Sequence, residues 1–297
     1  MNKERQAFHK VSRFLHTVLT KPTQIISNWE IDSQTVRQPW AVYERRFRFL
    51  HNLLADATRI MSNWEVHGIE NISNQEGPVC VCAPHYSAID LTEILTLTGQ
   101  HMVPVYKRQE PGTPGYLGTR LAEHIGGIET PKGNVNDQEN IDDNNSSKKI
   151  ALSNYRKFQD EIFKAWDKNR WVFIHPEGDK NHRQPMVSKP IFDLTKFIRR
   201  YEMRNEAIGI IRPEVAIVPI GLEYIEPTIQ VPGWRLTTPF PFATKTIFRF
   251  CEPIYLSEHQ DWTMDSCMRL LAKLSNRPYA PDIEKNRTTG DAISQDN

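Results

Sequence analysis

The sequence predicts an α/β fold, in which a mostly parallel central sheet is flanked by helices and a helical extension precedes the main domain. Short apolar, β-branched runs alternate along the chain with longer amphipathic segments, as they do in β-α-β units. The 297 residues are 39% hydrophobic and 25% charged, which is an ordinary globular composition with enough length for a large core. The net charge of +1 gives no reason to expect nucleic acid as a partner.

The N-terminal extension, residues 1–60, contains most of a duplicated segment. Residues 13–32 align without gaps on residues 48–67, and 11 of the 20 positions are identical. Each copy is typical of a helix that ends at Ser-Asn-Trp, which favours a helical hairpin packed on the main domain. The alternative is contact with an anionic membrane surface, which basic residues interleaved with large apolar ones would suit. These residues are Arg13, Phe14, Leu15, Arg45, Arg46, Phe47, Arg48, Phe49 and Leu50.

The main domain is predicted to span residues 61–281, with strands and helices in alternation. Short β-branched runs bounded by Gly, Pro or polar residues predict strands at 77–84, 101–107, 170–178, 214–224 and 246–256. Amphipathic periodicity predicts helices at 87–97, 114–124, 149–168, 189–201 and 262–274, the first with Ser87 as its N-cap. Residues 131–149 are almost free of apolar side chains and predict a flexible insertion, and residues 282–297 predict a disordered tail.

The cysteines and the N-terminus bear on location. Cys80 and Cys82 are separated by one residue in a strand-like run, a spacing that does not suit a disulfide, and we therefore expect a reduced, cytoplasmic protein. The N-terminus lacks the apolar stretch of a signal peptide, and no run of 18 apolar residues occurs. Contact with a membrane is therefore expected to be peripheral.

His85 and Asp90 form the first candidate site. Five positions separate them, so they lie apart on any straight helix or strand and meet only where the chain turns sharply. Such a turn is expected, because a strand ends near Ala83, Pro84 follows, and a helix begins near Ser87. An Asp bonded to one imidazole nitrogen leaves the other free to act as a general base. The alternative is that Asp90 only complements a helix dipole and His85 only closes a strand.

The stretch "FIHPEGDKNHR" (173–183) is the second candidate site. A strand enters a turn at Pro-Glu-Gly, where Gly178 permits an unusual backbone angle. Glu177 could bond a substrate hydroxyl, and Lys180 and Arg183 could hold a phosphate. Pro-Glu-Gly alone is also an ordinary turn signal.

In combination, the segments "APHYSAID", "FIHPEGDK", "SKPIF" and "IVPIGLEY" resemble the glycerolipid acyltransferase family, which includes glycerol-3-phosphate and 1-acylglycerol-3-phosphate acyltransferases. The resemblance spans roughly residues 64–256. It rests on a His and an Asp separated by four residues, a later Pro-Glu-Gly block, and a strand containing Val-Pro.

The resemblance implies a role for each matching residue. His85 would deprotonate the acceptor hydroxyl and Asp90 would orient it, whereas Glu177, Gly178 and Pro219 match the acceptor-binding blocks. Lys132, Lys180 and Arg183 are the cations nearest to the expected phosphate site. The acyl donor would be acyl-CoA or an acyl-carrier protein, and neither a metal nor a cofactor is implied. The expected acceptor is a lysophospholipid or a glycerol phosphate.

Departures from the family pattern favour a second class of acceptor. Thr130 stands where the family has a phosphate-binding arginine, and Lys180 replaces another arginine, whereas Asp179 and His175 replace Thr and Phe. Because Lys lacks the bidentate fork of Arg, a lipid acceptor without phosphate is the alternative.

Three other functions are weighed. Cys80, Cys82 and His85 could hold zinc, although no second ligand cluster at standard spacing accompanies them. Cys82 could be a nucleophile with His85 as its base. A non-catalytic lipid-binding protein could keep the same fold, although such a protein has no evident need for both His85 and Asp90.

Overall fold

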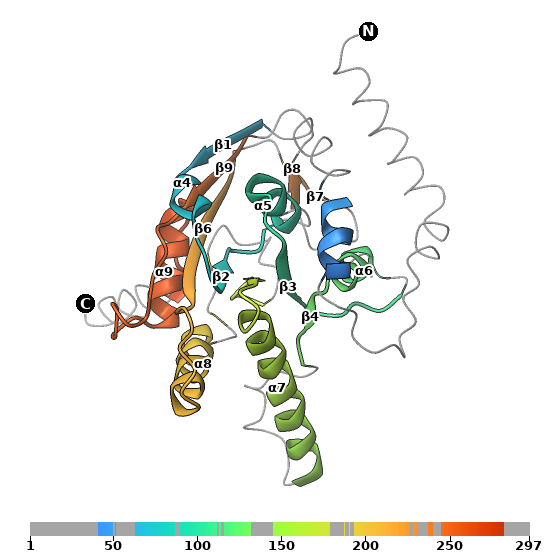
Figure 1. The fold of residues 1–297 in the computed structure, drawn as a ribbon. Helices are drawn as coiled ribbons and strands as arrows, with labels where there is room; N and C mark the ends of the chain where they lie inside the picture. Colours follow the sequence, from blue (N-terminus) through green and yellow to red (C-terminus); the bar gives the residue numbers. More distant parts are fainter. Residues whose placement is uncertain are drawn as a thin grey trace, which may run out of the picture.

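The computed structural model describes residues 41–49, 51, 63–86, 90–111, 113, 116–131, 145–178, 187, 190, 193–225, 228–230, 237–239 and 245–281. Within them, seven strands form one sheet in the order β1-β9-β6-β2-β5-β3-β4 (Figure 1). These strands are β1 (Asn63–His67), β2 (Val79–Cys82), β3 (Met102–Tyr106), β4 (Ile128–Glu129), β5 (Trp171–Ile174), β6 (Ala216–Ile225) and β9 (Lys245–Phe250). β7 (Thr228–Gln230) pairs with β8 (Thr237–Pro239) in a separate sheet.

The seven-stranded sheet is mostly parallel, which confirms the predicted fold class. Only the β6–β9 pairing is antiparallel, so β1 and β9 run against the other five strands. β6 is the longest strand, and its first half pairs with β2 while its second half pairs with β9. β2 and β5 are parallel neighbours, so their carboxyl ends lie together at one edge of the sheet, where ligands of open α/β sheets bind.

The helices cover both faces of this sheet. They are α4 (Glu70–Ser73), α5 (Asp90–Thr98), α6 (Tyr116–His124), α7 (Asn145–Trp166), α8 (Leu194–Ala207) and α9 (Met264–Leu274). Alternation along β2 divides the core, because Cys80 and Cys82 pack among residues of α7, α8 and α9 while Val79 and Val81 pack with α4 and α5. Figure 1 shows α9 and α5 separated by the strands.

The five predicted helices of the main domain form near their expected positions, with two differences of extent, whereas the short helix α4 was not predicted. α7 begins at Asn145, within the stretch expected to be a flexible insertion, and α8 begins at Leu194, where the Asp193 side chain accepts a hydrogen bond from the Lys196 backbone N–H. The rest of the predicted insertion, residues 132–144, and the predicted tail from residue 282 lie outside the described residues.

The last five residues of the duplicated segment correct one prediction. A helix was expected to end at the Ser-Asn-Trp of this copy, at residues 62–64, with the chain leaving it at 65–67. Residues 63–67 instead form strand β1, which pairs in parallel with β9. Their regular structure comes from a partner about 180 residues later in the chain, so no local pattern encodes it. The first copy of the repeat, residues 13–32, lies outside the described residues.

Residues 41–49 of the N-terminal extension are helical and pack on the main domain. Phe47 is buried and stacks on His101, with the ring centroids 5.0 Å apart, and Glu44 pairs with Arg170 at 3.3 Å. Packing of this segment agrees with the expected docking of the extension. It also removes Phe47 from the surface that the membrane alternative would use, whereas Phe49 stays exposed.

Candidate active site

His85 and Asp90 meet at the carboxyl end of β2. His85 lies three residues beyond β2, and Asp90 is the first residue of α5. Residues 87–89, including the expected N-cap Ser87, lie outside the described residues. The Nδ1 atom of His85 lies 3.1 Å from Oδ2 of Asp90. A carboxylate oxygen only accepts, so Nδ1 carries the proton and Nε2 is left as the basic nitrogen. The contact predicted between these residues is confirmed.

Asp90 also shapes the turn that brings it to the imidazole. Its side chain is fully buried, and Oδ2 accepts a second hydrogen bond, of 2.8 Å, from the backbone N–H of Tyr86. A carboxylate that accepts several donors is held ionised despite burial. The geometry thus favours a charged Asp90 facing His85.

The other oxygen of Asp90 belongs to a buried network. The Tyr224 hydroxyl, on β6, lies 2.5 Å from Asp90 Oδ1 and 3.0 Å from Oε2 of Glu93, which is also fully buried. The Trp64 indole N–H, on β1, donates to Glu93 Oε1 at 3.2 Å. Burial, followed by the neighbouring carboxyl groups of Asp90 and Glu93, raises the pKa of the Tyr224 phenol well above its ordinary value.

Glu177 is tied to His85 through the backbone. Its Oε2 accepts a hydrogen bond of 2.9 Å from the His85 N–H, and the side chain is buried. The contact forms because β2 and β5 are neighbours in the sheet and their following turns lie together. Gly178 closes the turn after β5 with its N–H on the His175 carbonyl at 2.9 Å and with φ of 63°, which confirms the expected left-handed backbone.

His175 places a second imidazole against the first. The rings of His85 and His175 are stacked, with centroids 3.9 Å apart and planes 10° from parallel. His175 Nδ1 lies 2.9 Å from the Ala83 carbonyl oxygen, so this nitrogen carries the proton. The stack fixes one face of His85.

The remaining predicted binding residues divide into two groups. Pro219 is buried in β6 opposite Cys82, and its carbonyl accepts the Cys251 N–H at 3.0 Å, so it belongs to the sheet that supports the site. Lys132, Lys180 and Arg183 lie outside the described residues, as does Asp179. Thr130 directly follows β4, and its N–H donates to the Tyr106 carbonyl at 2.8 Å.

Within the described residues, one group places three possible metal ligands close together: His85, Asp90 and His175, with ligand atoms within 4.8 Å of one another. The nearly parallel rings hold their nitrogen lone pairs in separate planes, and both Nδ1 atoms already face oxygen partners. This arrangement does not converge on one ion as a zinc site requires.

The cysteines of β2 point away from the candidate site. Cys80 and Cys82 are buried in the core on the α9 side, and all four cysteines are free thiols. For Cys82, contact with the Cys267 thiol favours the thiolate, but contact with Cys80 and burial outweigh it, and the pKa rises well above its ordinary value. A high thiol pKa disfavours a nucleophile, so Cys82 suits the core better than catalysis.

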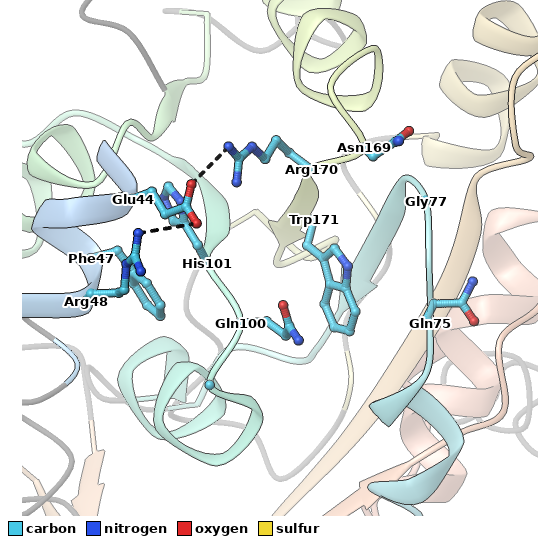
Figure 2. A pocket seen from close by; sticks show the side chains of 11 residues that line it. Glu44, Phe47, Arg48, Gln75, Gly77, Gln100, His101, Asn169, Arg170 and Trp171 are labelled. Carbon is cyan, nitrogen blue, oxygen red and sulfur yellow. Dashed lines mark hydrogen bonds and ion pairs between the residues drawn. The ribbon is translucent and has the colours of Figure 1, made fainter. Parts of the chain in front are cut away.

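A separate cavity of about 310 Å³ lies at the opposite edge of the sheet (Figure 2). It is formed where the amino ends of β3 and β5 face helix 41–49, and Figure 2 shows Glu44 pairing with both Arg170 and Arg48. Since His85 follows a carboxyl end, the cavity is not part of the candidate active site. Its lining residues are Glu44, Phe47, Arg48, Gln75, Gly77, Gly99, Gln100, His101, Asn169, Arg170 and Trp171.

The part of the chain that the structure describes contains no helix that is both long and apolar enough to cross a membrane.

A scan against models of protein families and a search of curated proteins find no match to this chain. Among solved structures, the crystal structure of the 1-acyl-sn-glycerophosphate (LPA) acyltransferase PlsC from Thermotoga maritima is similar, with a TM-score of 0.44 and 13% sequence identity. The similarity covers 93% of this chain and 97% of that chain. Because similarity at this level does not define an activity, the function is proposed from the geometry of the site.

Sequence reasoning missed three polar residues of the site: Glu93, His175 as a ring partner, and Tyr224. A signal exists for Glu93, because it lies one helical turn after Asp90 and must share its face. Tyr224 closes the segment "IVPIGLEY", but its contact with Asp90 depends on tertiary structure.

Proposed function

We propose that this protein is an O-acyltransferase that moves a fatty acyl group from an acyl thioester to a hydroxyl of a glycerolipid-type acceptor. The observation that carries the proposal is the hydrogen bond between His85 Nδ1 and the buried Asp90 carboxylate. It leaves Nε2 to take a proton from a hydroxyl, and the resemblance to glycerolipid acyltransferases in the surrounding motifs supports the reaction class.

The proposed reaction is a direct transfer. His85 Nε2 removes the proton from the acceptor hydroxyl as its oxygen attacks the thioester carbonyl carbon. The tetrahedral intermediate collapses, the carbon–sulfur bond breaks, and the leaving thiolate takes the proton from the imidazolium. Asp90 stabilises that imidazolium at 3.1 Å, and no acyl group is attached to the enzyme.

Glu177 has a positioning role in this proposal. The resemblance suggested that it binds the acceptor, but its Oε2 accepts the His85 backbone N–H, which ties the turn after β5 to the base. Glu177→Gln keeps an acceptor oxygen at this place and is expected to keep most activity. Glu177→Ala leaves a buried N–H without its acceptor, which costs about 1–3 kcal/mol and displaces His85. If Glu177→Gln and Glu177→Ala instead lost activity to the same extent, Glu177 would be in contact with the acceptor.

The acceptor class is proposed from the same resemblance, with lysophosphatidate-type lipids first. A lipid without phosphate is the second candidate, and Thr130 favours it, because this side chain is uncharged at the place where the family has an arginine. The donor is acyl-CoA or acyl-carrier protein.

One assay tests the function. Purified full-length protein is incubated with a labelled acyl thioester and, in turn, glycerol 3-phosphate, lysophosphatidate and monoacylglycerol. We expect labelled product with one acceptor class from the wild type and at least 100-fold less from His85→Ala, since a general base contributes roughly 10²–10⁴ in rate. Equal transfer by the two proteins would overturn the mechanism, and absence of transfer to every acceptor would overturn the function.

Peripheral membrane contact is also proposed, through residues before the packed helix 41–49. Protein lacking residues 1–40 is expected to lose sedimentation with anionic vesicles while its melting temperature changes little, because Phe47 and Glu44 remain docked. Unchanged sedimentation would contradict this proposal.

A further inference from the structure

The Tyr224 hydroxyl lies between two carboxyl groups that are both fully buried. Its oxygen is 2.5 Å from Asp90 Oδ1 and 3.0 Å from Glu93 Oε2. The two acids lie one turn apart on α5 and face β6 together. Tyr224 pairs with Thr246 of β9 in the sheet, and Thr246 pairs with Trp64 of β1. The two acids therefore lie against the part of the sheet that β6, β9 and β1 form.

A count of protons constrains the charges of this group. A tyrosine hydroxyl has one hydrogen, so it donates one short hydrogen bond and must accept the other. An ionised carboxylate cannot donate. One of the two carboxyl groups therefore carries a proton and donates it to the Tyr224 oxygen.

The distances and donors assign that proton to Glu93. Hydrogen bonds from a hydroxyl to an ionised oxygen measure roughly 2.5–2.7 Å, which matches the contact with Asp90 and not the contact with Glu93. Asp90 also accepts from His85 Nδ1 and from the Tyr86 N–H. Three donors on one carboxylate strongly favour its ionised form.

We propose that Glu93 is protonated at neutral pH, and that Glu93 and Tyr224 act as positioning residues that hold Asp90 ionised against His85. Three hydrogen bonds are linked in this arrangement. The Glu93 carboxylic acid donates to the Tyr224 oxygen, the Tyr224 hydroxyl donates to Asp90, and His85 Nδ1 also donates to Asp90. Its catalytic consequence rests on the proposed function, in which His85 is the general base.

Other ionisable side chains of the described residues lie beside these hydrogen bonds. His175 stacks on His85, and Glu177 accepts the His85 backbone N–H. The guanidinium carbon of Arg277 lies 3.4 Å from the centroid of the Tyr86 ring, beside the turn. Two protons, one on Glu93 and one on the Tyr224 hydroxyl, therefore leave a single negative charge among the two acids and the phenol, and it faces His85 from Asp90.

Infrared spectroscopy of the purified full-length protein tests the proton directly. Glu202→Gln protein is the reference for this experiment, because burial raises the pKa of Glu202 to about 7 and its carboxylic acid would add a band of its own. At neutral pH, we expect the C=O stretch of a protonated carboxylic acid in the reference and its loss when Glu93→Gln is added. The matched control is Glu223→Gln, on the residue before Tyr224. Glu223 pairs with Arg249 at 2.6 Å, and hydrogen bonds from Asn276 and Arg249 outweigh burial and lower its pKa, so it is ionised and its removal leaves the band in place. A band that survives the addition of Glu93→Gln to the Glu202→Gln reference, or is absent from that reference, overturns the assignment.

The pH dependence of kcat/KM tests the consequence for His85. Glu93→Gln removes no charge from a protonated acid, so the acid limb of the profile is expected to keep its midpoint, whatever the change in rate. If Glu93 were ionised, losing its charge would lower the pKa of His85 and move that limb to lower pH.

Tyr224→Phe deletes only the hydroxyl and keeps the ring in the sheet. Asp90 loses one donor, becomes more basic, and stabilises the imidazolium more strongly, so we expect the acid limb to move upward by about one unit. A variant that only loses thermal stability, with its acid limb unmoved, would show a structural role and overturn the positioning role. Failure of the wild type to transfer acyl groups would remove the proposed function, but the infrared result would still decide where the proton lies.

Discussion

Asp90→Asn separates the charge of Asp90 from its hydrogen bonds. An asparagine that places its oxygen at the Oδ2 position still accepts from the Tyr86 N–H and from His85 Nδ1, at the present 2.8 and 3.1 Å. Its NH₂ group then faces the Tyr224 oxygen, which accepts, while the Tyr224 hydroxyl donates to Glu93, which releases its own proton to solvent. Every contact keeps a donor and an acceptor, so we expect the variant to fold with a melting temperature close to that of the wild type.

The size of the rate loss follows from the distance to the imidazolium. Two unit charges 3.1 Å apart interact by about 5 kcal/mol at an effective dielectric constant of about 20, which corresponds to a ceiling of about 10⁴ in rate. Once Glu93 has released its proton to solvent it carries the negative charge, farther from His85 than Asp90 was, so the loss lies below this ceiling. We expect kcat to fall by about 10²–10⁴, with KM for the acyl donor little changed.

The assay is steady-state release of the thiol from an acyl thioester at saturating acceptor, with thermal unfolding measured on the same samples. A kcat within threefold of the wild type, in a protein of unchanged melting temperature, would refute the role of the Asp90 charge. A large loss of stability would refute the expectation that asparagine satisfies the donors of the turn.

Four further substitutions test the surroundings of the site and the sheet. His175→Phe keeps a flat ring beside His85 but loses the hydrogen bond to the Ala83 carbonyl, so the free energy of unfolding in urea should fall by about 1 kcal/mol. Gly221→Ala would place a Cβ 2.4 Å from the backbone of the last residue of α9 and should destabilise by about 1–3 kcal/mol, whereas Gly118→Ala meets nothing within 4 Å in its helix and should stabilise by about 0.5–1 kcal/mol. Burial raises the pKa of Glu202 to about 7, so the folded state binds its proton more tightly than the unfolded state, and stability falls as pH rises from 4.5 to 7. Glu202→Gln should therefore stabilise by about 1 kcal/mol at pH 8, a figure reduced for partial exposure, and should add nothing at pH 4.

Each of these outcomes has a clear opposite. Unchanged stability of His175→Phe would show that the ring nitrogen contributes nothing to the turn. Equal effects of alanine at Gly221 and Gly118 would mean that β6 and α9 separate easily. A gain from Glu202→Gln that is the same at both pH values would have a cause other than titration.

The elements near the site were predictable because local patterns encode them. β2 and β5 are short apolar runs bounded by Gly, Pro or polar residues, and α5 is amphipathic. β1 was missed because the run Asn-Trp-Glu-Val-His is only partly apolar and becomes a strand by pairing with β9.

Among the contacts of the candidate site, only the one between His85 and Asp90, which a single turn of the chain brings about, was predictable from the sequence. His85 and Asp90 are five residues apart, and a proline between strand and helix is enough to suggest their contact. The contact of Glu177 with His85 joins residues 92 positions apart in the chain, and the contact of Tyr224 with Asp90 joins residues 134 positions apart. Both contacts depend on the order of the strands and on which face of the sheet α5 covers. No spacing rule reaches that far.

The same separations decide when the protein becomes chemically competent during synthesis. His85 and Asp90 leave the ribosome early, but the carboxylate is not fully enclosed until β6 has been made and has paired with β2. At roughly 5–20 residues per second, the 134 residues between Asp90 and Tyr224 take roughly ten seconds to translate. A nascent chain in that interval carries His85 and Asp90 without Tyr224, so the proposed acyl transfer would begin only after β6 has paired in the sheet.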